Sequence, residues 1–318
     1  MIGITMGDPA GIGPEIIVKG WSAMSGHRVV YGDVQVLKHA AEQFAPALEV
    51  SVQGPTDDPK VLVVVPCGEL PTPPQPGVLS PAAGAAGFQA LEHAVGAALR
   101  GSLTAVVTAP IHKKAWSRAG IHYPGHTEYL AQQAGTEVAM ILANDELAVA
   151  LATVHCSMQQ AIEQIRVGAV DAILPKAWAA AQALGFDTPR IAVAGLNPHA
   201  GEQGLFGDEE IQFIEPAIRR FNRPSVTGPY SGDTVFMRAR QGEFDLVVAM
   251  THDQGLIPVK YLGVERGVNF TAGLPFVRTS PDHGTAFEIA GTGQADPSAM
   301  VYAYDQALRI LNRRSATP

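Results

Sequence analysis

The sequence predicts an α/β protein in which short strands alternate with helices. Short runs of valine, isoleucine and alanine recur along the chain, and segments with helical periodicity lie between many of them. Strands that alternate with helices favour a largely parallel sheet, or two such sheets, covered by helices. The length of 318 residues fits two domains or one large α/β unit.

The individual elements follow from the same patterns. Proline is well tolerated in the first helical turn, so Pro14 predicts a helix over 14–24. The proline-rich stretch 66–83 predicts a surface excursion. Amphipathic patterns predict helices at 84–99, 158–184 and 298–312, the last with Ser298 as its cap. The apolar runs predict strands near 2–5, 28–31, 61–65, 104–108, 138–142, 147–154, 190–195 and 245–250.

The composition restricts the classes of partner. With 22 basic and 30 acidic residues the net charge is −8, and no basic run is present, so we expect no nucleic-acid binding. No apolar stretch is long enough for a membrane span, and the first residues lack a secretory signal, so we expect a cytoplasmic protein without a membrane partner. A hydrophobic content of 47% fits a compact protein with extensive internal surface or a subunit interface, and we expect an oligomer.

Three histidines stand just past the ends of short apolar runs. His155 follows 147–154, His199 follows 191–198 and His252 follows 246–251. If these runs are neighbouring parallel strands, their carboxyl ends open into one crevice, where three imidazoles would form an open metal site. Two observations weigh against this interpretation. A histidine after a strand is commonly only a surface residue, and a hairpin of 138–142 with 147–154 would weaken the case for His155.

Other polar residues suggest sites for anions. His126 and Thr127 open a predicted helix, where free amides can bind phosphate, although Thr127 fits a simple helix cap better. Lys260, Asn269 and Arg278 add two cations and an amide, which suit an anionic ligand or a solvated surface.

Two segments rich in small residues could approach a ligand closely. The segment Gly-Asp-Pro-Ala-Gly-Ile-Gly-Pro-Glu at 7–15 leads from a strand into a helix, but it lacks the third glycine of the dinucleotide fingerprint. The segment 279–297 is dense in glycine, alanine, serine and threonine, as an adenine-ribose loop requires. A plain strand-to-helix turn explains 7–15 better, and a loop that is merely rich in turn-forming residues would look similar to 279–297. Cys156, next to His155, is interpreted as a packing residue because adjacent residues on an extended segment face opposite sides.

Five motifs occur in one order over nearly the whole chain: the segment at 7–15, Pro-Gly-His-Thr-Glu at 124–128, Asn-Pro-His-Ala-Gly-Glu at 197–202, His-Asp-Gln-Gly-Leu-Ile-Pro at 252–258, and Gly-Leu-Pro-Phe-Val-Arg-Thr-Ser-Pro-Asp-His-Gly-Thr-Ala at 273–286. Together they resemble the 4-hydroxythreonine-4-phosphate dehydrogenase family of vitamin B6 synthesis. The last motif also resembles the adenosine-binding loop of the wider isocitrate and isopropylmalate dehydrogenase group.

The resemblance implies two α/β/α domains with the active site in the cleft between them and at the interface of a homodimer. Residues 1–125 with 270–318 would form the cofactor-side domain, and 126–269 would form the domain for metal, substrate and dimer contacts.

The resemblance also implies roles for particular residues. Three histidines would bind a divalent metal shared across the dimer: His155, His199 and His252. Zinc is expected, with magnesium or cobalt as alternatives. NAD or NADP would accept hydride, held by His283, Gly284, Thr285 and Ala286. The phosphorylated hydroxy acid would be bound by His126, Thr127, Lys260, Asn269 and Arg278.

The expected reaction is oxidation of the 3-hydroxyl of 4-phosphooxy-L-threonine, followed by decarboxylation to 3-amino-2-oxopropyl phosphate. We expect Lys260 to handle a proton or bind the carboxylate, and Asp233 and Asp253 to orient the histidines through hydrogen bonds.

The chain departs from the family pattern at Cys-Ser-Met-Gln-Gln after His155, at Thr251, and at Ser231-Gly232. Because these departures leave the substrate open, D-threonate or D-erythronate 4-phosphate is the alternative. A metal-dependent phosphate hydrolase and a catalytically silent metabolite-binding protein are alternatives from other classes. The small-residue loop at 279–297 argues against the hydrolase, which needs no nucleotide pocket.

Overall fold

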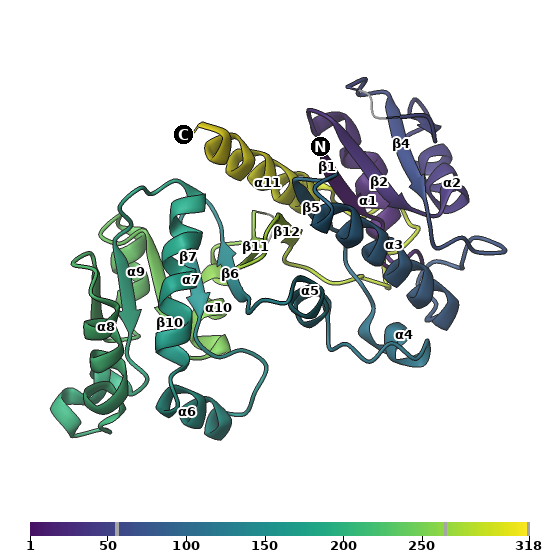
Figure 1. Ribbon diagram of the computed structural model, residues 1–318. Coiled ribbons are helices and arrows are strands. Elements are labelled where there is room, and N and C mark those ends of the chain that lie inside the picture. Colours follow the sequence, from purple (N-terminus) through teal and green to yellow (C-terminus); the bar gives the residue numbers. More distant parts are fainter. Residues whose placement is uncertain (55–56, 264–265, 317–318) are drawn as a thin grey trace. The chain divides into compact units, whose positions relative to one another are not determined.

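The computed structural model describes residues 1–54, 57–263 and 266–316, and its strands and helices alternate along the chain (Figure 1). The chain divides into two compact units. Unit 1 contains Met1–Glu137 and Leu274–Asn312, and unit 2 contains Val138–Gly273 and a short segment from Arg313. The predicted limits lay at 125 and 270, so helix α5 (His126–Ala134) falls in unit 1 and not in the second domain.

The strands of unit 1 form a parallel sheet in the order β3-β4-β2-β1-β5-β12. Strands β1, β2 and β5 are completely buried, which explains their largely apolar sequences. The bounds are β1 Ile2–Thr5, β2 Arg28–Gly32, β3 Glu49–Ser51, β4 Val61–Pro66, β5 Ala105–Thr108 and β12 Val277–Pro281.

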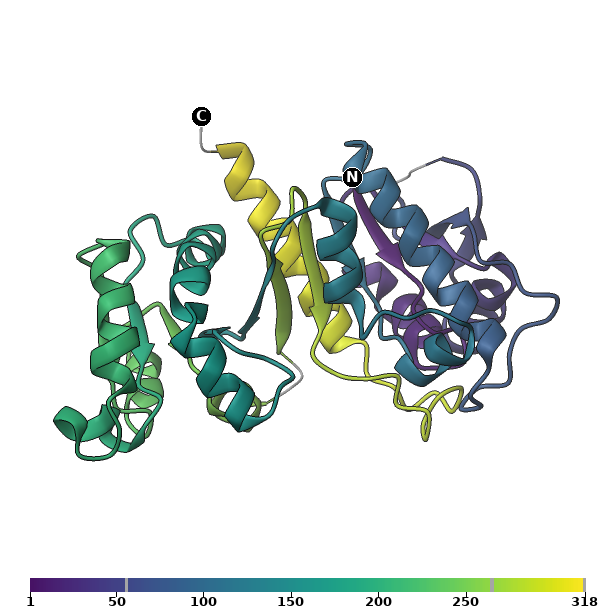
Figure 2. The same cartoon turned by 60° about the horizontal axis from the view of Figure 1, so that its bottom comes forward.

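Helices cover both faces of this sheet (Figures 1 and 2). The right-handed connections between parallel strands place α1 and α2 on one face and α3 on the other, since the chain reverses direction along the sheet after the edge strand β3. Pro14 lies in the first turn of α1, as predicted. Ser298 is the first residue of α11 and not its cap, and it donates hydrogen bonds to Asp296. The bounds are α1 Gly13–Gly20, η1 Trp21–Ala23, α2 Val34–Phe44, α3 Pro81–Leu99, α4 Lys113–Arg118 and α11 Ser298–Ala316.

Helix α3 approaches its neighbours by backbone contact. A Cβ at Gly87 would lie 2.5 Å from the carbonyl oxygen of Gly7, and one at Gly84 would lie 2.6 Å from the carbonyl carbon of Ala115. Gly7 itself has φ +74°, which favours glycine. The helix therefore fixes the turn after β1 and the helix α4 through positions where only glycine fits.

The strands of unit 2 lie in the order β11-β6-β7-β10-β8-β9. Strand β6 is antiparallel to β11 and β7, so the hairpin expected from the sequence is confirmed. Strands β7, β10, β8 and β9 run parallel. The bounds are β6 Ala139–Ala143, β7 Ala148–Leu151, β8 Ile191–Ala194, β9 Val226–Tyr230, β10 Leu246–Ala249 and β11 Val268–Ala272.

Helices α7 and α8 pack on one face of this sheet, and α9 and α10 contribute to the buried cluster on the other. The prediction of a single helix over 158–184 is wrong, because the helix is interrupted at Gly168, which has φ +106°. The bounds are α6 Met158–Arg166, α7 Ala169–Leu184, η2 Pro198–Gly204, η3 Glu210–Ile214, α8 Glu215–Phe221, α9 Val235–Arg240 and α10 His252–Tyr261. Within the described ranges, no helix is long and apolar enough to cross a membrane.

Candidate active site

The three histidines singled out in the sequence follow neighbouring parallel strands of unit 2. Strand β10 pairs in parallel with β7 on one side and with β8 on the other. His155 follows β7, His252 follows β10 and His199 follows β8. The expectation that these strands are parallel neighbours is confirmed, and the carboxyl ends of such strands are where α/β sheets bind ligands.

Side-chain hydrogen bonds hold these strand ends in register. Thr153 Oγ1 donates to the carbonyl oxygen of Met250 at 2.8 Å. Gln254 Oε1 accepts from Met250 N at 2.7 Å, and its Nε2 donates to the carbonyl oxygen of Gly195 at 2.8 Å. One threonine and one glutamine thus link the ends of β7, β10 and β8.

His155 and His252 lie together at a pocket. Their ring centroids are 5.4 Å apart. His252 is the first residue of α10, and its Nδ1 lies 2.7 Å from Asp253 Oδ1, a partner that fixes the ring orientation. The pocket has a volume of about 510 Å³. Its lining includes both histidines, Cys156, Met158 and Thr251.

His199 lies in a different environment. It is exposed on the turn after β8, with its ring centroid 6.2 Å from that of Phe206. Within the part of the chain that the structure describes, no three His, Cys, Asp or Glu side chains gather closely enough to hold a metal ion. Asp233 is also exposed and accepts a hydrogen bond of 2.6 Å from Ser231 Oγ.

Two further predicted residues belong to unit 2. Lys260 lies exposed near the end of α10. Asn269 lies on β11, opposite Leu142 of β6. Its Oδ1 is buried and accepts no hydrogen bond from the residues that the structure describes. A buried acceptor without a donor costs free energy, which a bound donor would restore.

Unit 1 contains His126, Thr127 and Arg278. Gly125 caps α5, so the interpretation of Thr127 as the helix cap is wrong. His126 Nε2 is buried without a hydrogen-bond partner among the described residues. Burial, with the positive charges of Arg278 and Lys113, holds the pKa of His126 well below its ordinary value, so the imidazole is neutral near pH 7. Arg278 is 3% exposed and donates to Thr108 Oγ1 at 2.7 Å, and burial lowers its pKa to about 10.

The predicted cofactor loop follows β12 in unit 1. Ile12 N donates to the carbonyl oxygen of Thr285 at 3.0 Å, and a Cβ at Gly11 would lie 2.9 Å from the Thr285 Cβ. Ala286 has φ +41°, Gly284 has open space around it, and His283 Nε2 is buried without a partner in the described ranges. The turn after β1 and the loop after β12 therefore meet closely.

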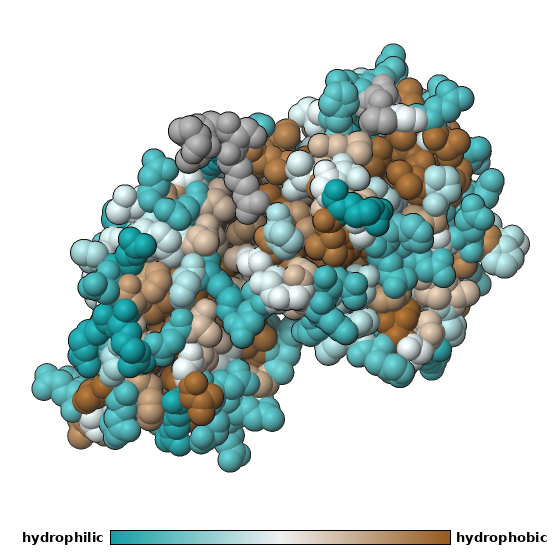
Figure 3. Space-filling model, in the orientation of Figure 1, coloured by the Kyte–Doolittle hydropathy of each residue, from teal (hydrophilic) through white to brown (hydrophobic). Residues whose placement is uncertain are grey.

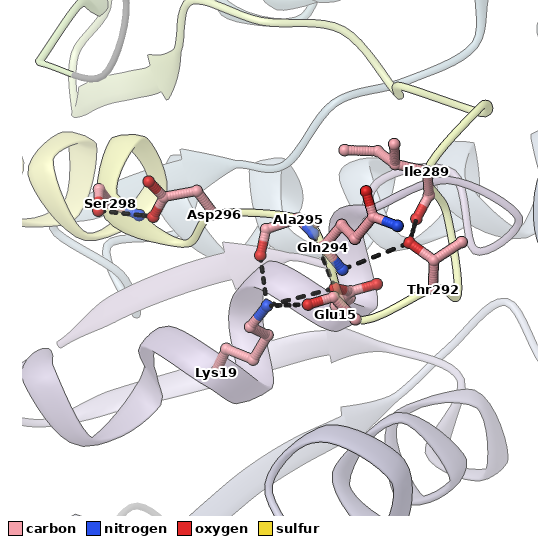
Figure 4. Close-up of polar contacts among 9 residues, drawn as sticks. Glu15, Lys19, Ile289, Thr292, Gln294, Ala295, Asp296 and Ser298 are labelled. Atoms are coloured by element: carbon pink, nitrogen blue, oxygen red, sulfur yellow. Dashed lines mark hydrogen bonds and ion pairs between the residues drawn. The ribbon is translucent and has the colours of Figure 1, made fainter.

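Helix α1 ties down the far end of this loop (Figure 4). Lys19 Nζ donates to the carbonyl oxygens of Gly293 and Ala295, at 2.8 and 2.5 Å. The buried Glu15 carboxylate accepts from Ala295 N at 3.0 Å and lies 3.4 Å from Lys19 Nζ. Lys19 thus binds carbonyl groups of the loop and Glu15 binds an N–H group of it, so both side chains hold the loop against α1.

Sequence reasoning missed Asp8, which lies beside this loop region in the turn after β1. Its side chain is 1% exposed, its Oδ1 accepts from Ala10 N at 2.9 Å, and its Oδ2 is buried without a partner in the described part of the chain. Burial raises its pKa. Nearby, the rings of His112 and Phe287 lie 4.6 Å apart. The signal available in the sequence was an aspartate inside a glycine-rich strand-to-helix turn, which is equally common as a simple turn residue.

The residues present fit a divalent metal and a nucleotide by their chemistry. His155 and His252 are two imidazoles at a pocket, and one of them is held by a carboxylate. The buried Nε2 of His283 and the close approach of Gly11 to Thr285 fit a polar ligand lying against the backbone. By its fold and these sites, this protein belongs to the class of α/β enzymes that act on small polar substrates at strand ends.

The comparison with known proteins defines this class further. The family model described as pyridoxal phosphate biosynthetic protein PdxA matches residues 25–307. The chain is 52% identical to the 4-hydroxythreonine-4-phosphate dehydrogenase of Beijerinckia indica, over 97% of this chain and 94% of that protein. It is 40% identical to the D-threonate 4-phosphate dehydrogenase of Pectobacterium atrosepticum, over 98% and 99%. The crystal structure of 4-hydroxythreonine-4-phosphate dehydrogenase from Klebsiella pneumoniae superposes with a TM-score of 0.86 at 41% identity, over 98% and 99%.

The chain belongs to the PdxA family. It is an oxidative decarboxylating dehydrogenase, and membership implies NAD or NADP and a divalent metal. The alternatives of a phosphate hydrolase and of a silent binding protein are therefore wrong.

Proposed function

We propose that the protein oxidises 4-phosphooxy-L-threonine at its 3-hydroxyl and decarboxylates the product to 3-amino-2-oxopropyl phosphate. The identity of 52% over 97% of the chain to an enzyme named for 4-hydroxythreonine 4-phosphate carries this proposal. When bound, NAD or NADP would accept the hydride from C3, and the hydroxyl proton would be released. The bond from C2 to the carboxylate then breaks, CO₂ leaves, and a proton adds to C2.

The bound divalent cation, zinc in our proposal, supplies positive charge beside the oxygen that loses its proton. His155, His252 and His199 are its proposed ligands, and Asp253 orients His252 through Nδ1. Asp233 is proposed to orient a second histidine. Lys260 is the proposed proton donor to C2.

The proposed substrate ligands share an ability to bind phosphate or carboxylate oxygens. The neutral His126 donates one N–H and keeps no positive charge, whereas Arg278 presents a buried guanidinium. Asn269 and the Thr127 hydroxyl complete the group with Lys260. In the cofactor loop, we propose that His283, Gly284, Thr285 and Ala286 hold the adenosine part of NAD or NADP.

We further propose that the metal site is completed in a homodimer. A single chain does not bring the three histidines together within the described ranges, so at least one ligand would come from a second copy. Large apolar side chains near these histidines in the sequence are exposed to solvent. Leu205 is 72% and Phe206 49% exposed beyond His199, and Met158 is 63% exposed beyond His155. Apolar residues are visible among polar ones on the face in Figure 3. An exposed apolar surface of this kind fits a subunit contact.

D-threonate 4-phosphate is the second candidate substrate, with D-erythronate 4-phosphate as its close variant. Several relatives at 40 to 43% identity are named for D-threonate 4-phosphate. Two of the departures from the family pattern, the segment after His155 and Thr251, contribute residues to the pocket beside the histidines, where Cys156, Met158 and Thr251 lie. The three acids share the phosphate, the 3-hydroxyl and the carboxylate, so the same chemistry applies to each.

A substrate screen tests the proposal. The purified protein, loaded with zinc, is given NAD or NADP and each of the three 4-phosphorylated acids, and reduced cofactor is followed by absorbance. We expect the highest kcat/KM with 4-phosphooxy-L-threonine and no reduced cofactor after chelation of the metal. A higher kcat/KM with D-threonate 4-phosphate would transfer the assignment to that acid. Release of phosphate without reduced cofactor would contradict the proposed reaction.

A further inference from the structure

The turn that carries His199 has an unusual backbone. His199, Ala200, Glu202 and Gln203 have φ of 53°, 52°, 43° and 55°, and Gly201 between them has φ 79°. In the left-handed conformation Cβ lies close to the following carbonyl oxygen, which is unfavourable for a residue with a side chain. Four such residues in one turn persist only when the surrounding structure holds them in place.

Glu210 is the group that contacts this turn from inside the unit. It is 1% exposed and begins η3. Its Oε1 accepts from Leu196 N and Asn197 N, both at 2.7 Å, and its Oε2 accepts from Asn197 Nδ2 at 3.0 Å. A Cβ at Gly201 would lie 2.8 Å from Oε2. One buried carboxylate therefore binds the chain that enters the turn and packs against its middle.

Asn197 can satisfy its neighbours in only one orientation. Its Nδ2 donates to Glu210 Oε2 and also to Glu209 Oε2, at 3.0 and 2.8 Å. Glu209 Oε1 accepts from Arg166 at 3.1 Å. The amide N–H₂ thus lies between two carboxylates, and a flipped amide would place its oxygen against both.

We propose that Glu210 is a positioning residue, which holds the left-handed turn so that His199 is presented for metal binding. This inference rests on the proposed function in one respect, namely that His199 is a metal ligand. Glu210 contacts the backbone before the ligand and not the metal, so it acts on metal affinity through the turn.

The substitution Glu210→Gln tests the orientation of the network with little change of volume. The new amide keeps one oxygen for Leu196 N and Asn197 N, but its N–H₂ then faces Asn197 Nδ2. Flipping Asn197 would turn its oxygen towards the Glu209 carboxylate. The double substitution Glu209→Gln with Glu210→Gln removes this conflict, because a flipped Asn197 can then accept from both new amides. Glu215→Gln, at the half-buried first position of α8, is the matched control.

Two measurements on the full-length protein separate positioning from stability. Zinc affinity is measured by chelator competition, and amide hydrogen exchange is measured in the metal-free protein over 195–207. For Glu210→Gln we expect zinc affinity about 10- to 100-fold weaker and faster exchange over 195–207, with an unchanged melting temperature. The double substitution should recover most of the zinc affinity, and Glu215→Gln should change neither measurement.

Three outcomes would overturn the proposal. Faster exchange with unchanged zinc affinity would make Glu210 purely structural. Equally weakened zinc affinity in the single and double variants, with unchanged exchange over 195–207, would show that Glu210 acts on the metal through its charge and not by holding the turn. Unchanged zinc affinity in His199→Ala would show that His199 is not a metal ligand. That result would contradict this part of the proposed function, independently of any result with Glu210→Gln.

Discussion

The two units use the carboxyl ends of their strands differently. In unit 1, backbone segments meet closely, as at Gly11 and Thr285, and the polar groups left without partners in the described ranges are buried, as in His126 and His283. In unit 2, Asn269 Oδ1 is likewise buried without a partner among the described residues, but His155 and His199 are exposed on the loops that follow their strands. Buried unpartnered groups mark a surface that is already shaped for its ligand. In our proposal, the exposed histidines form a site that a second copy of the chain completes.

The largest expected effect is in unit 2. Substituting His155 by alanine removes one of the two imidazoles at the pocket and should lower kcat/KM about 1000-fold, or about 4 kcal/mol, since the cation stabilises the developing charge. Zinc affinity and steady-state rates measure it. His93→Ala, an exposed histidine on α3, is the control. Full activity in His155→Ala would show that this exposed histidine of unit 2 does not bind the metal.

A change in unit 1 should affect the cofactor without the metal. In Gly11→Ala the added methyl group would lie 2.9 Å from Thr285 Cβ and would displace the cofactor loop. We expect the KM for NAD or NADP to rise about tenfold, from a cost of about 1.4 kcal/mol for overpacking. Zinc affinity should stay unchanged. Gly96→Ala on α3, where the nearest atom is the flexible end of Arg100, is the control. A loss of zinc affinity in Gly11→Ala would contradict the separation.

The burial of His126 predicts a pH dependence of stability. Because its folded pKa is depressed, the unfolded chain binds the proton first as the pH falls. The free energy of unfolding should therefore fall below about pH 6.5, by up to about 1.4 kcal/mol per pH unit from this group, until the folded pKa is reached. Denaturant unfolding at several pH values measures it. His126→Gln should flatten this slope, and an unchanged slope would show that His126 is not buried neutral.

The cysteines offer the mildest test, with one in each unit. Cys67 is buried, and burial raises its pKa to about 12, whereas Cys156 is half-buried in the wall of the pocket. A thiol reagent at pH 8 should therefore modify Cys156 and spare Cys67 in the folded protein. Mass spectrometry identifies the modified residue, and Cys156→Ser should take up no label. Zinc and substrate should slow the labelling of Cys156. Equal labelling of both thiols would place Cys67 outside the core.

The apolar strands and the helices α1, α3 and α11 were predictable because their sequences are periodic or uniformly buried. Strand β9 was missed because Gly228 and Pro229 interrupt it, and β12 because Arg278, Thr279 and Ser280 are polar residues inside a buried strand. Their burial depends on tertiary contacts, such as the hydrogen bond from Thr279 to Ala303. A local pattern does not contain such contacts.

The candidate site was predictable in part. The three histidines could be placed at the ends of parallel neighbours from strand patterns alone, and the structure confirms that arrangement. The left-handed turn at His199 and the clamp by Glu210 could not be predicted, because only Gly201 within the turn signals positive φ. Asp8 was missed because its burial depends on the packing of the turn that contains it.

The glycines of α3 constrain how the protein could change. Gly84 and Gly87 press the helix directly onto the main chain of its neighbours, and no side chain lies between them to be exchanged. New substrate preferences would therefore arise more readily from Cys156, Met158 and Thr251 in the pocket wall, which can vary in size without moving the main chain. An engineer who seeks a new specificity should begin a library there and leave α3 untouched.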